Sequence, residues 1–143
     1  MFHLKITTMR LTILLMIIGA AFIAFLSFNG GVGIQKVGND IPPESFQEKM
    51  QENDVKVIDI RRDDELESLG YIEGAEQIDF DSDDFKEKIK ALDKDETYLL
   101  YCASDNRSGQ AVDMMNEMGF NDVLHLEGGF NEWKRQDLPV KEK

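Results

Sequence analysis

The stretch Thr97-Tyr98-Leu99-Leu100-Tyr101-Cys102-Ala103-Ser104-Asp105-Asn106-Arg107-Ser108 contains the features that decide the fold of this chain. Its first five residues form a hydrophobic run typical of a short buried strand, and a helical pattern follows over residues 110–118 and ends at Gly119. Cys102, the one cysteine of the chain, is therefore expected at a strand-to-helix turn. Free backbone N–H groups and the positive end of the helix dipole favour a thiolate there. The stretch thus predicts a sulfur nucleophile beside an anion site, with Arg107 adding a positive charge.

Strand-like and helix-like segments alternate through the rest of the chain. Strands are expected over residues 34–37, 55–60, 77–80, 97–101 and 122–126. Helices are expected over residues 44–51, 83–92 with Ser82 as its cap, 110–118 and 129–136, with a helical turn over residues 66–69. This alternation predicts an α/β fold: right-handed βαβ units and a mostly parallel central sheet with helices on both faces. Ligands bind such sheets beyond the carboxyl ends of the strands, where Cys102 is expected.

Three further motifs accompany the cysteine segment in a fixed order. They are Val57-Ile58-Asp59-Ile60-Arg61, Gly70-Tyr71-Ile72-Glu73-Gly74-Ala75 and Leu126-Glu127-Gly128-Gly129-Phe130-Asn131-Glu132-Trp133. These three motifs, together with a cysteine loop that has four residues between Cys102 and Arg107, resemble the motifs of the rhodanese-like sulfurtransferases. The resemblance covers about residues 34–140. Tyr71 and Glu73 stand where that family usually has His and Pro. The resemblance implies a rhodanese-like fold and transfer of sulfur through a cysteine persulfide.

The loop residues receive roles from this chemistry. Sulfur transfer needs a thiolate that attacks a sulfane sulfur, holds it as a persulfide and passes it to a second nucleophile. Cys102 is the expected nucleophile. Its anionic partners are expected to bind in a cradle of N–H groups from Ala103, Ser104, Asp105, Asn106 and Arg107. Arg107 is expected either to steer the substrate anion or to brace the loop, and Ser108 either to donate to sulfur or to cap the next helix.

Other candidate residues are given structural or supporting roles. The resemblance implies that Asp59 and Arg61 support the loop, and a local salt bridge at the strand end is equally compatible with their positions. Trp133 is interpreted as a core aromatic and Gly128-Gly129 as a tight turn. His125 lies in an apolar strand and is interpreted as packing rather than as a general base. Cys102 itself has the alternative of a small, inert core residue.

Asp105 departs from the resembling loops, many of which have Gly at this position. Its charge is expected to disfavour the thiolate and to repel thiosulfate, unless the carboxylate caps a backbone N–H and points outward. A persulfide or protein-borne sulfur donor is therefore favoured over thiosulfate. A thiol, glutathione or a thioredoxin-like protein, is the acceptor that the resemblance implies. No cofactor is expected, and no metal, because the acidic runs lack the spacing of a calcium loop.

Two other functions remain open. Cysteine phosphatases, and the arsenate reductases grouped with them, share a related arrangement but have five residues between Cys and Arg. The four residues here form a tighter cradle suited to sulfur, so this activity is the less favoured enzymatic alternative. A non-catalytic rhodanese-like module that binds a protein partner at the membrane is the second hypothesis, and Asp105 and Tyr71 favour it. A reactive Cys102 is expected to alkylate at a lower pH than an ordinary thiol, and a structural one hardly at all.

Residues 11–28 contain no charged side chain and, at ~1.5 Å per residue in a helix, nearly match a ~30 Å hydrocarbon layer. They are longer than the apolar region of a signal peptide and lack a good cleavage site, so an uncleaved transmembrane anchor is favoured over a cleaved signal. The expected organisation is an N-terminal flank (1–10), the anchor (11–28), a Gly-rich flexible linker (29–33) and the rhodanese-like domain (34–143). Lys5 and Arg10 place the N-terminus in the cytoplasm and the domain outside the cell, in a single-pass membrane protein.

The net charge is −12, and every Asp and Glu follows residue 28. A domain this acidic will not bind nucleic acid or an anionic membrane surface through its bulk charge. A single cysteine cannot form an internal disulfide. In an oxidising compartment its thiol is therefore either buried and inert or a reactive functional group.

Overall fold

The computed structural model describes residues 38–143. The expected anchor (11–28), the linker (29–33) and the expected strand over residues 34–37 lie outside the described residues. Within residues 38–143, no helix has the length and apolar character needed to cross a membrane.

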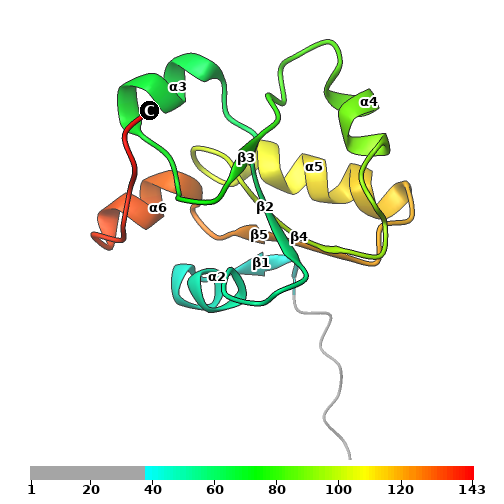
Figure 1. Cartoon of the computed structure of the whole chain (residues 1–143), viewed down its shortest axis with the longest axis horizontal. Coiled ribbons are helices and arrows are strands. Elements are labelled where there is room, and N and C mark those ends of the chain that lie inside the picture. Colours follow the sequence, from blue (N-terminus) through cyan, green and yellow to red (C-terminus); the bar gives the residue numbers. More distant parts are fainter. Residues whose placement is uncertain (1–37) are drawn as a thin grey trace, which may run out of the picture. The chain divides into compact units, whose positions relative to one another are not determined.

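The sheet has five parallel strands in the order β1-β5-β4-β2-β3 (Figure 1). The strands are β1 (Asp40–Ile41), β2 (Val55–Asp59), β3 (Glu76–Gln77), β4 (Thr97–Tyr101) and β5 (Asp122–Leu126). The predicted α/β fold with a parallel sheet is confirmed. The strand that feeds the cysteine, β4, occupies the central position. Because β2 and β5 flank it in parallel, the carboxyl ends of all three strands open toward one edge of the sheet.

Within residues 38–143, four helices connect the strands: α2 (Pro43–Lys49), α3 (Asp63–Leu69), α4 (Phe85–Lys90) and α5 (Asn106–Glu117). A fifth helix, α6 (Gly129–Arg135), follows β5. Three of them differ clearly from the prediction. Helix α3 is a full helix that begins at Asp63, where the sequence predicted only a helical turn over residues 66–69. Helix α5 begins four residues early, because the Gly109 N–H already donates to the Asp105 carbonyl at 2.8 Å and starts the helical ladder. Helix α4 is shorter than expected, and Ser82 does not cap it. The Ser82 hydroxyl donates instead to the Asp79 carbonyl at 2.7 Å, within the preceding turn.

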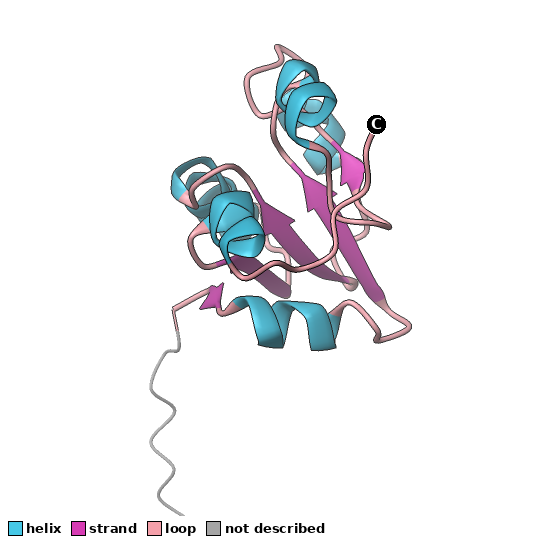
Figure 2. Ribbon diagram, turned by 90° about the vertical axis from the view of Figure 1, so that its left-hand side faces the viewer, coloured by secondary structure: helices cyan, strands magenta, loops and turns pink. Residues whose placement is uncertain are grey.

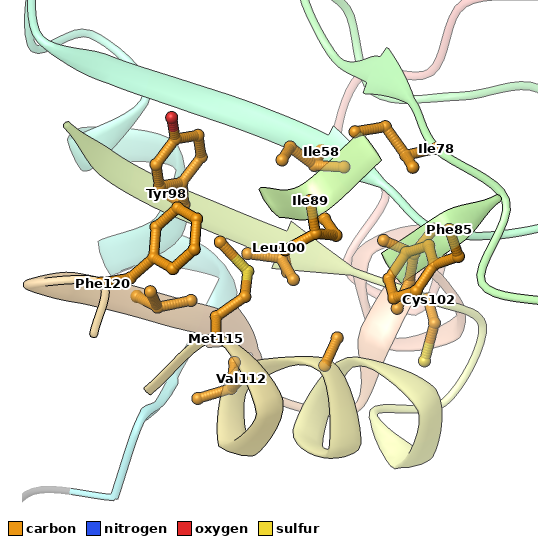
Figure 3. Packing of buried hydrophobic residues seen from close by; sticks show 13 residues of the cluster. Ile58, Ile78, Phe85, Ile89, Tyr98, Leu100, Cys102, Val112, Met115 and Phe120 are labelled. Carbon is orange, nitrogen blue, oxygen red and sulfur yellow. The ribbon is translucent and has the colours of Figure 1, made fainter. Parts of the chain in front are cut away.

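Successive residues of the strands point to opposite faces of the sheet, which creates two core layers. One layer combines Ile58 and Leu100 with apolar residues of α4 and α5 (Figure 3). The other combines Val57 and Leu99 with apolar residues of α2 and α6. Helices therefore cover both sides of the sheet, as Figure 2 shows. Strands buried on both faces explain why the sequences of β2 and β4 read as apolar runs rather than as alternating patterns.

The turn after α3 is held by the C-terminal segment. Tyr71 forms an antiparallel bridge with Lys141, with both N–H···O distances at 2.8 Å. The Tyr101 hydroxyl, from the end of β4, accepts from the Ile72 N–H at 3.1 Å. These contacts fix the end of α3 against the carboxyl edge of the sheet, and this is how α3 comes to lie beside the cysteine loop.

Candidate active site

Cys102 directly follows β4, at the carboxyl edge of the sheet. Only 1% of the residue is exposed, and it belongs to the same apolar cluster as Phe85 (Figure 3). Burial alone is what an inert core cysteine would show. The polar groups around the loop therefore distinguish a reactive site from a structural one.

The carbonyl side of the loop is held by the first turn of α6. The N–H of Phe130 donates to the Cys102 carbonyl at 2.8 Å, and the N–H of Asn131 donates to the Ala103 carbonyl at 3.0 Å. Gly129 makes this approach possible, because it has a positive φ of 61° and a Cβ there would lie 2.7 Å from the Cys102 oxygen. With two carbonyls turned toward α6, the loop is fixed in one orientation.

The N–H groups on the other side of the loop have no backbone partner. Among residues 38–143, none of the backbone N–H groups of residues 103–108 donates to a backbone carbonyl. They run from the loop into the first turn of α5, whose dipole adds positive potential at this end. Such a set of free donors at the start of a helix is suited to binding an anion. The predicted cradle residues therefore lie together, with their donors available.

Asp105 adopts the left-handed conformation, with φ of 69°, that a Gly would adopt without strain. Within the described part of the chain, its carboxylate accepts no hydrogen bond from the cradle N–H groups. Oδ2 accepts from the Gly128 N–H at 3.3 Å, in the turn before α6. Of the two expectations for Asp105, the structure has the one in which the carboxylate caps a backbone N–H.

Arg107 reaches from α5 to α3. Its Nη2 and Nη1 donate to the two carboxylate oxygens of Glu65 at 2.7 and 2.9 Å, and Asp81 lies 3.7 Å away. The side chains of Arg107 and Glu65 are 19% and 14% exposed. The hydrogen bond with Glu65 raises the pKa of Arg107, and the same bond lowers the pKa of Glu65. Because the guanidinium is engaged in this fork, the geometry corresponds to a brace for the loop rather than to a free charge that steers an anion.

Asp59 and Arg61 form a second pair, which is almost completely buried. Arg61 Nη2 lies 2.6 Å from Asp59 Oδ2 and 2.8 Å from the Gly70 carbonyl, and its Nε lies 3.0 Å from Asp59 Oδ1. The guanidinium also lies over the Phe130 ring, with Cζ 3.9 Å from the centroid. Burial acts to lower the pKa of Arg61, but the hydrogen bonds and charge of Asp59 outweigh it and the pKa is raised. The pair thus connects the end of β2 with the Gly70 turn and with α6, which holds the loop.

Ser108 lies between the sulfur and the β5 strand. Its Oγ is 3.5 Å from Cys102 Sγ, donates to the Asp105 carbonyl at 3.0 Å, and lies 3.2 Å from His125 Nδ1. On the far side of the imidazole ring, His125 Nε2 contacts the carboxylate of Asp40. His125 is buried, as the interpretation as packing implies, but both of its ring nitrogens have polar partners.

The family model described as "Rhodanese-like domain" matches residues 42–136 of this chain. The chain belongs to the rhodanese-like family. It is 37% identical over 94 residues to the thiosulfate sulfurtransferase GlpE of Pseudomonas fluorescens, which corresponds to 66% of this chain and 83% of that protein. It is 35% identical over 101 residues to the uncharacterized protein slr1261 of Synechocystis, covering 70% of this chain and 54% of that protein.

A solved structure supports the same family assignment. The rhodanese-related protein of Thermoplasma volcanium superposes on the chain with a TM-score of 0.64 and 30% identity, covering 73% of this chain and 98% of that one. The matched residues of the rhodanese-like domain include all four motifs that the resemblance rested on.

Sequence reasoning missed three partners of the loop in this rhodanese-like domain. Glu65 is 42 residues from Arg107, and His125 is 17 residues from Ser108. Gly129 was expected only to make a tight turn, and its close approach to the loop was not foreseen. No local pattern marks such pairs, because each depends on which strand edges and helix ends the topology brings together.

Proposed function

We propose that this rhodanese-like domain is a sulfurtransferase in which Cys102 carries sulfane sulfur as a persulfide. One observation carries the proposal. Cys102 begins a loop whose N–H groups from residues 103–108 have no backbone partner within residues 38–143, at the start of the longest described helix. A buried structural cysteine has no need of such a set of free donors.

The proposed reaction has two displacement steps. The Cys102 thiolate attacks the outer sulfur of a persulfide R–S–SH, so that a new S–S bond forms on Cys102 and the donor S–S bond breaks. The donor leaves with the bonding electron pair as the thiolate RS⁻. A second thiolate then attacks the terminal sulfur of the Cys102 persulfide and restores the Cys102 thiolate. No oxidant or reductant is consumed, because the sulfane sulfur changes only its carrier.

The loop donors are proposed to stabilise the charge in both steps. The N–H groups of residues 103–107 bind the terminal sulfur of the persulfide and the anionic part of the donor, while Ser108 donates to the Cys102 sulfur. Arg107 acts from a distance, since its fork with Glu65 fixes the start of α5. Asp59 and Arg61 are proposed to act in the same indirect way, through the Gly70 turn and α6.

The donor is proposed to be a small persulfide, with thiosulfate as the poorer substrate. The domain is strongly acidic, and the Asp105 carboxylate lies at the loop even though it is bonded to Gly128. Both features disfavour a dianion such as thiosulfate. A low-molecular-weight thiol such as glutathione, or a thioredoxin-like protein, is the proposed acceptor.

Attachment to the cell membrane through residues 11–28, with the N-terminus in the cytoplasm and the domain outside, is also a proposal, and the apolar sequence supports it. Extraction of cell membranes with alkaline carbonate tests it. The full chain should remain in the membrane pellet, and a variant with Leu14→Lys and Ile18→Lys should be released. Release of the unaltered chain by carbonate would contradict the anchor.

Sulfur loading tests the function. The full chain, purified in a mild detergent, is incubated with glutathione persulfide or with thiosulfate, and its intact mass is measured. We expect the gain of one sulfur atom, faster from the persulfide and reversed by cyanide. Cys102→Ser should gain none, whereas Ser104→Ala, which keeps the thiol and the backbone donors, should still be loaded.

The non-catalytic binding module is the second candidate, and the 1% exposure of Cys102 is the observation that favours it. In that case neither donor adds sulfur and the thiol alkylates slowly even at high pH. This combined result would exclude the sulfurtransferase, whereas loading from either donor would exclude the inert module.

A further inference from the structure

A chain of polar contacts leads from the Cys102 sulfur to the surface of the domain. Cys102 Sγ lies 3.5 Å from Ser108 Oγ, and that oxygen lies 3.2 Å from His125 Nδ1. His125 Nε2 contacts the Asp40 carboxylate, and the Asp40 side chain is 59% exposed. The first three residues are buried. Four different elements of the fold thus contribute to one continuous path: the end of β4, α5, β5 and β1.

The Ser108 hydroxyl is the point where this path divides. A hydroxyl has one proton to donate, and three acceptors lie around Ser108 Oγ: the Cys102 sulfur, the Asp105 carbonyl and His125 Nδ1. Only one of them can receive the proton in a given arrangement. The Cys102 thiolate receives this proton only when neither the Asp105 carbonyl nor His125 Nδ1 accepts it.

The protonation state of His125 changes the number of acceptors in this competition. Neutral His125, with its proton on Nε2 toward Asp40, presents Nδ1 as an acceptor that competes for the Ser108 proton. Protonated His125 presents Nδ1–H as a donor to Ser108 Oγ. Nδ1 then no longer accepts, and only the Asp105 carbonyl still competes with the sulfur for the hydroxyl proton.

We propose that His125 is a positioning residue that controls, through Ser108, the hydrogen bond received by the Cys102 thiolate. Protonation of His125 turns Ser108 toward the sulfur, and deprotonation turns it away. The effect on sulfur transfer rests on the proposed function, whereas the effect on the free thiolate does not. No group is oxidised or reduced and no covalent bond between heavy atoms changes.

The hollow beside His125 has an acidic lining. A hollow of about 350 Å³ beside the ring is lined by Asp40 from β1, by Asp105 and Asp113 at and along α5, and by the uncharged residues Asn39, Gly109 and Val112. Three of the lining residues are thus acidic, and none is Lys or Arg. The same hollow gives water access to Asp40, through which a proton can reach the ring.

The test follows the rate of Cys102 alkylation by iodoacetamide, an uncharged reagent, from about pH 5 to about pH 9, a range that spans histidine and thiol titration. The full chain is used in a mild detergent. The profile should show two inflections, one from the thiol and one from His125. Below the His125 inflection, the hydrogen bond should raise the fraction of Cys102 present as thiolate. The observed alkylation rate should rise with it, by a factor of up to about ten relative to a variant without the contact, the equivalent of one charge-assisted hydrogen bond.

His125→Asn should remove the lower inflection and leave a single thiol titration. His3→Asn, which replaces the only other histidine of the chain, is the matched control and should leave both inflections. In a Ser108→Ala background, His125→Asn should have no further effect, because the connection to the sulfur is already cut. Two inflections in His125→Asn, or an undiminished effect in the Ser108→Ala background, would overturn the proposal.

A variant at the surface provides a test that does not depend on correct folding of the variants at buried residues. Asp40→Asn changes an exposed side chain that contacts His125 Nε2, and should alter the pH profile of Cys102 alkylation when Ser108 is present but not in the Ser108→Ala background. The same change in both backgrounds, or no change in either, would contradict the role of His125. If sulfur loading fails while these pH profiles behave as expected, the proposed sulfurtransferase falls and the positioning role of His125 stands.

Discussion

Two arginine–carboxylate pairs flank the cysteine loop, and they differ mainly in burial. Arg61 and Asp59 have side chains that are 0% and 1% exposed, whereas those of Arg107 and Glu65 are 19% and 14% exposed. Both pairs are forked and short, at 2.6 and 2.7 Å for their closest atoms. The same chemistry therefore operates in two environments, one inside the core and one at its margin.

This difference in burial gives the two pairs different roles: the buried pair stabilises the fold, and the partly exposed pair positions the loop. A buried pair that loses one partner leaves a charge without solvent, which is costly even where the intact pair adds little net stability. A pair at the margin exchanges its partner for water at small cost. We therefore expect the Arg61 pair to control whether the carboxyl edge of the sheet assembles, and the Arg107 pair to control where the loop lies once it has.

The largest effect is expected from Asp59→Asn. This change keeps the shape of the side chain but leaves the buried guanidinium of Arg61 without its counter-charge, and should cost about 3–5 kcal/mol of unfolding free energy. Urea unfolding followed by tryptophan fluorescence measures it. Glu52→Gln, in an exposed pair with Lys49, is the control and should change little. A loss for Asp59→Asn as small as that of the control would break the comparison between the two pairs.

Gly129→Ala is expected to come next. The added Cβ would lie 2.7 Å from backbone atoms of three loop residues, at a positive φ. Gly74→Ala is a close control, because its φ is also positive but no atom lies within 4 Å of the Cβ position. The control should lose about 1–2 kcal/mol from the backbone conformation alone. Gly129→Ala should lose more and also change the alkylation rate of Cys102. Equal losses of stability in the two variants would show that close packing of α6 against the loop does not contribute.

Glu65→Gln should have a smaller effect on stability and a clear effect on the site. Partial exposure limits the expected loss to about 1 kcal/mol, while the freed Arg107 should alter Cys102 alkylation. Asp81→Asn, whose carboxylate lies 3.7 Å from Arg107, is the weaker neighbour and should alter alkylation less. A rate unchanged in Glu65→Gln would exclude the bracing role of Arg107.

The same variant defines a pH window. Because the hydrogen bond from Arg107 lowers the pKa of Glu65 from its usual 4.5, the carboxylate binds fewer protons in the folded state. Its stabilising contribution is thus fully present above about pH 4.5 and is lost as the pH falls through the lowered folded value. The stability difference between the unaltered chain and Glu65→Gln should shrink accordingly in urea unfolding at decreasing pH.

Asp105→Gly should have the smallest effect on stability. Glycine relieves the left-handed conformation, whereas loss of the carboxylate removes the bond from the Gly128 N–H, so the two contributions oppose each other. The net change should be within about 1 kcal/mol. Loading of sulfur from thiosulfate should increase relative to loading from the persulfide. An unchanged preference would show that Asp105 does not select the donor.

The sequence was sufficient where the determinants are local or repeated along a strand. The apolar run of β4, the turn at Cys102 and the alternation of segments predicted the parallel sheet and the position of the thiol. The start of α5 was placed too late, because the left-handed turn at Asp105 begins the helix earlier than its apolar face does. The contacts of Arg107 with Glu65, of Ser108 with His125 and of Gly129 with the loop could not be predicted, since each joins segments far apart in the chain.

The hold of α6 on the cysteine loop also has a consequence for protein synthesis. The ribosome makes Cys102 and its loop before it makes Gly129, Phe130 and Asn131, whose backbone takes the loop carbonyls. A nascent chain that has reached only α5 already has its thiol but lacks the groups that orient the loop. The order of translation thereby delays the final orientation of the loop until the last core helix has docked.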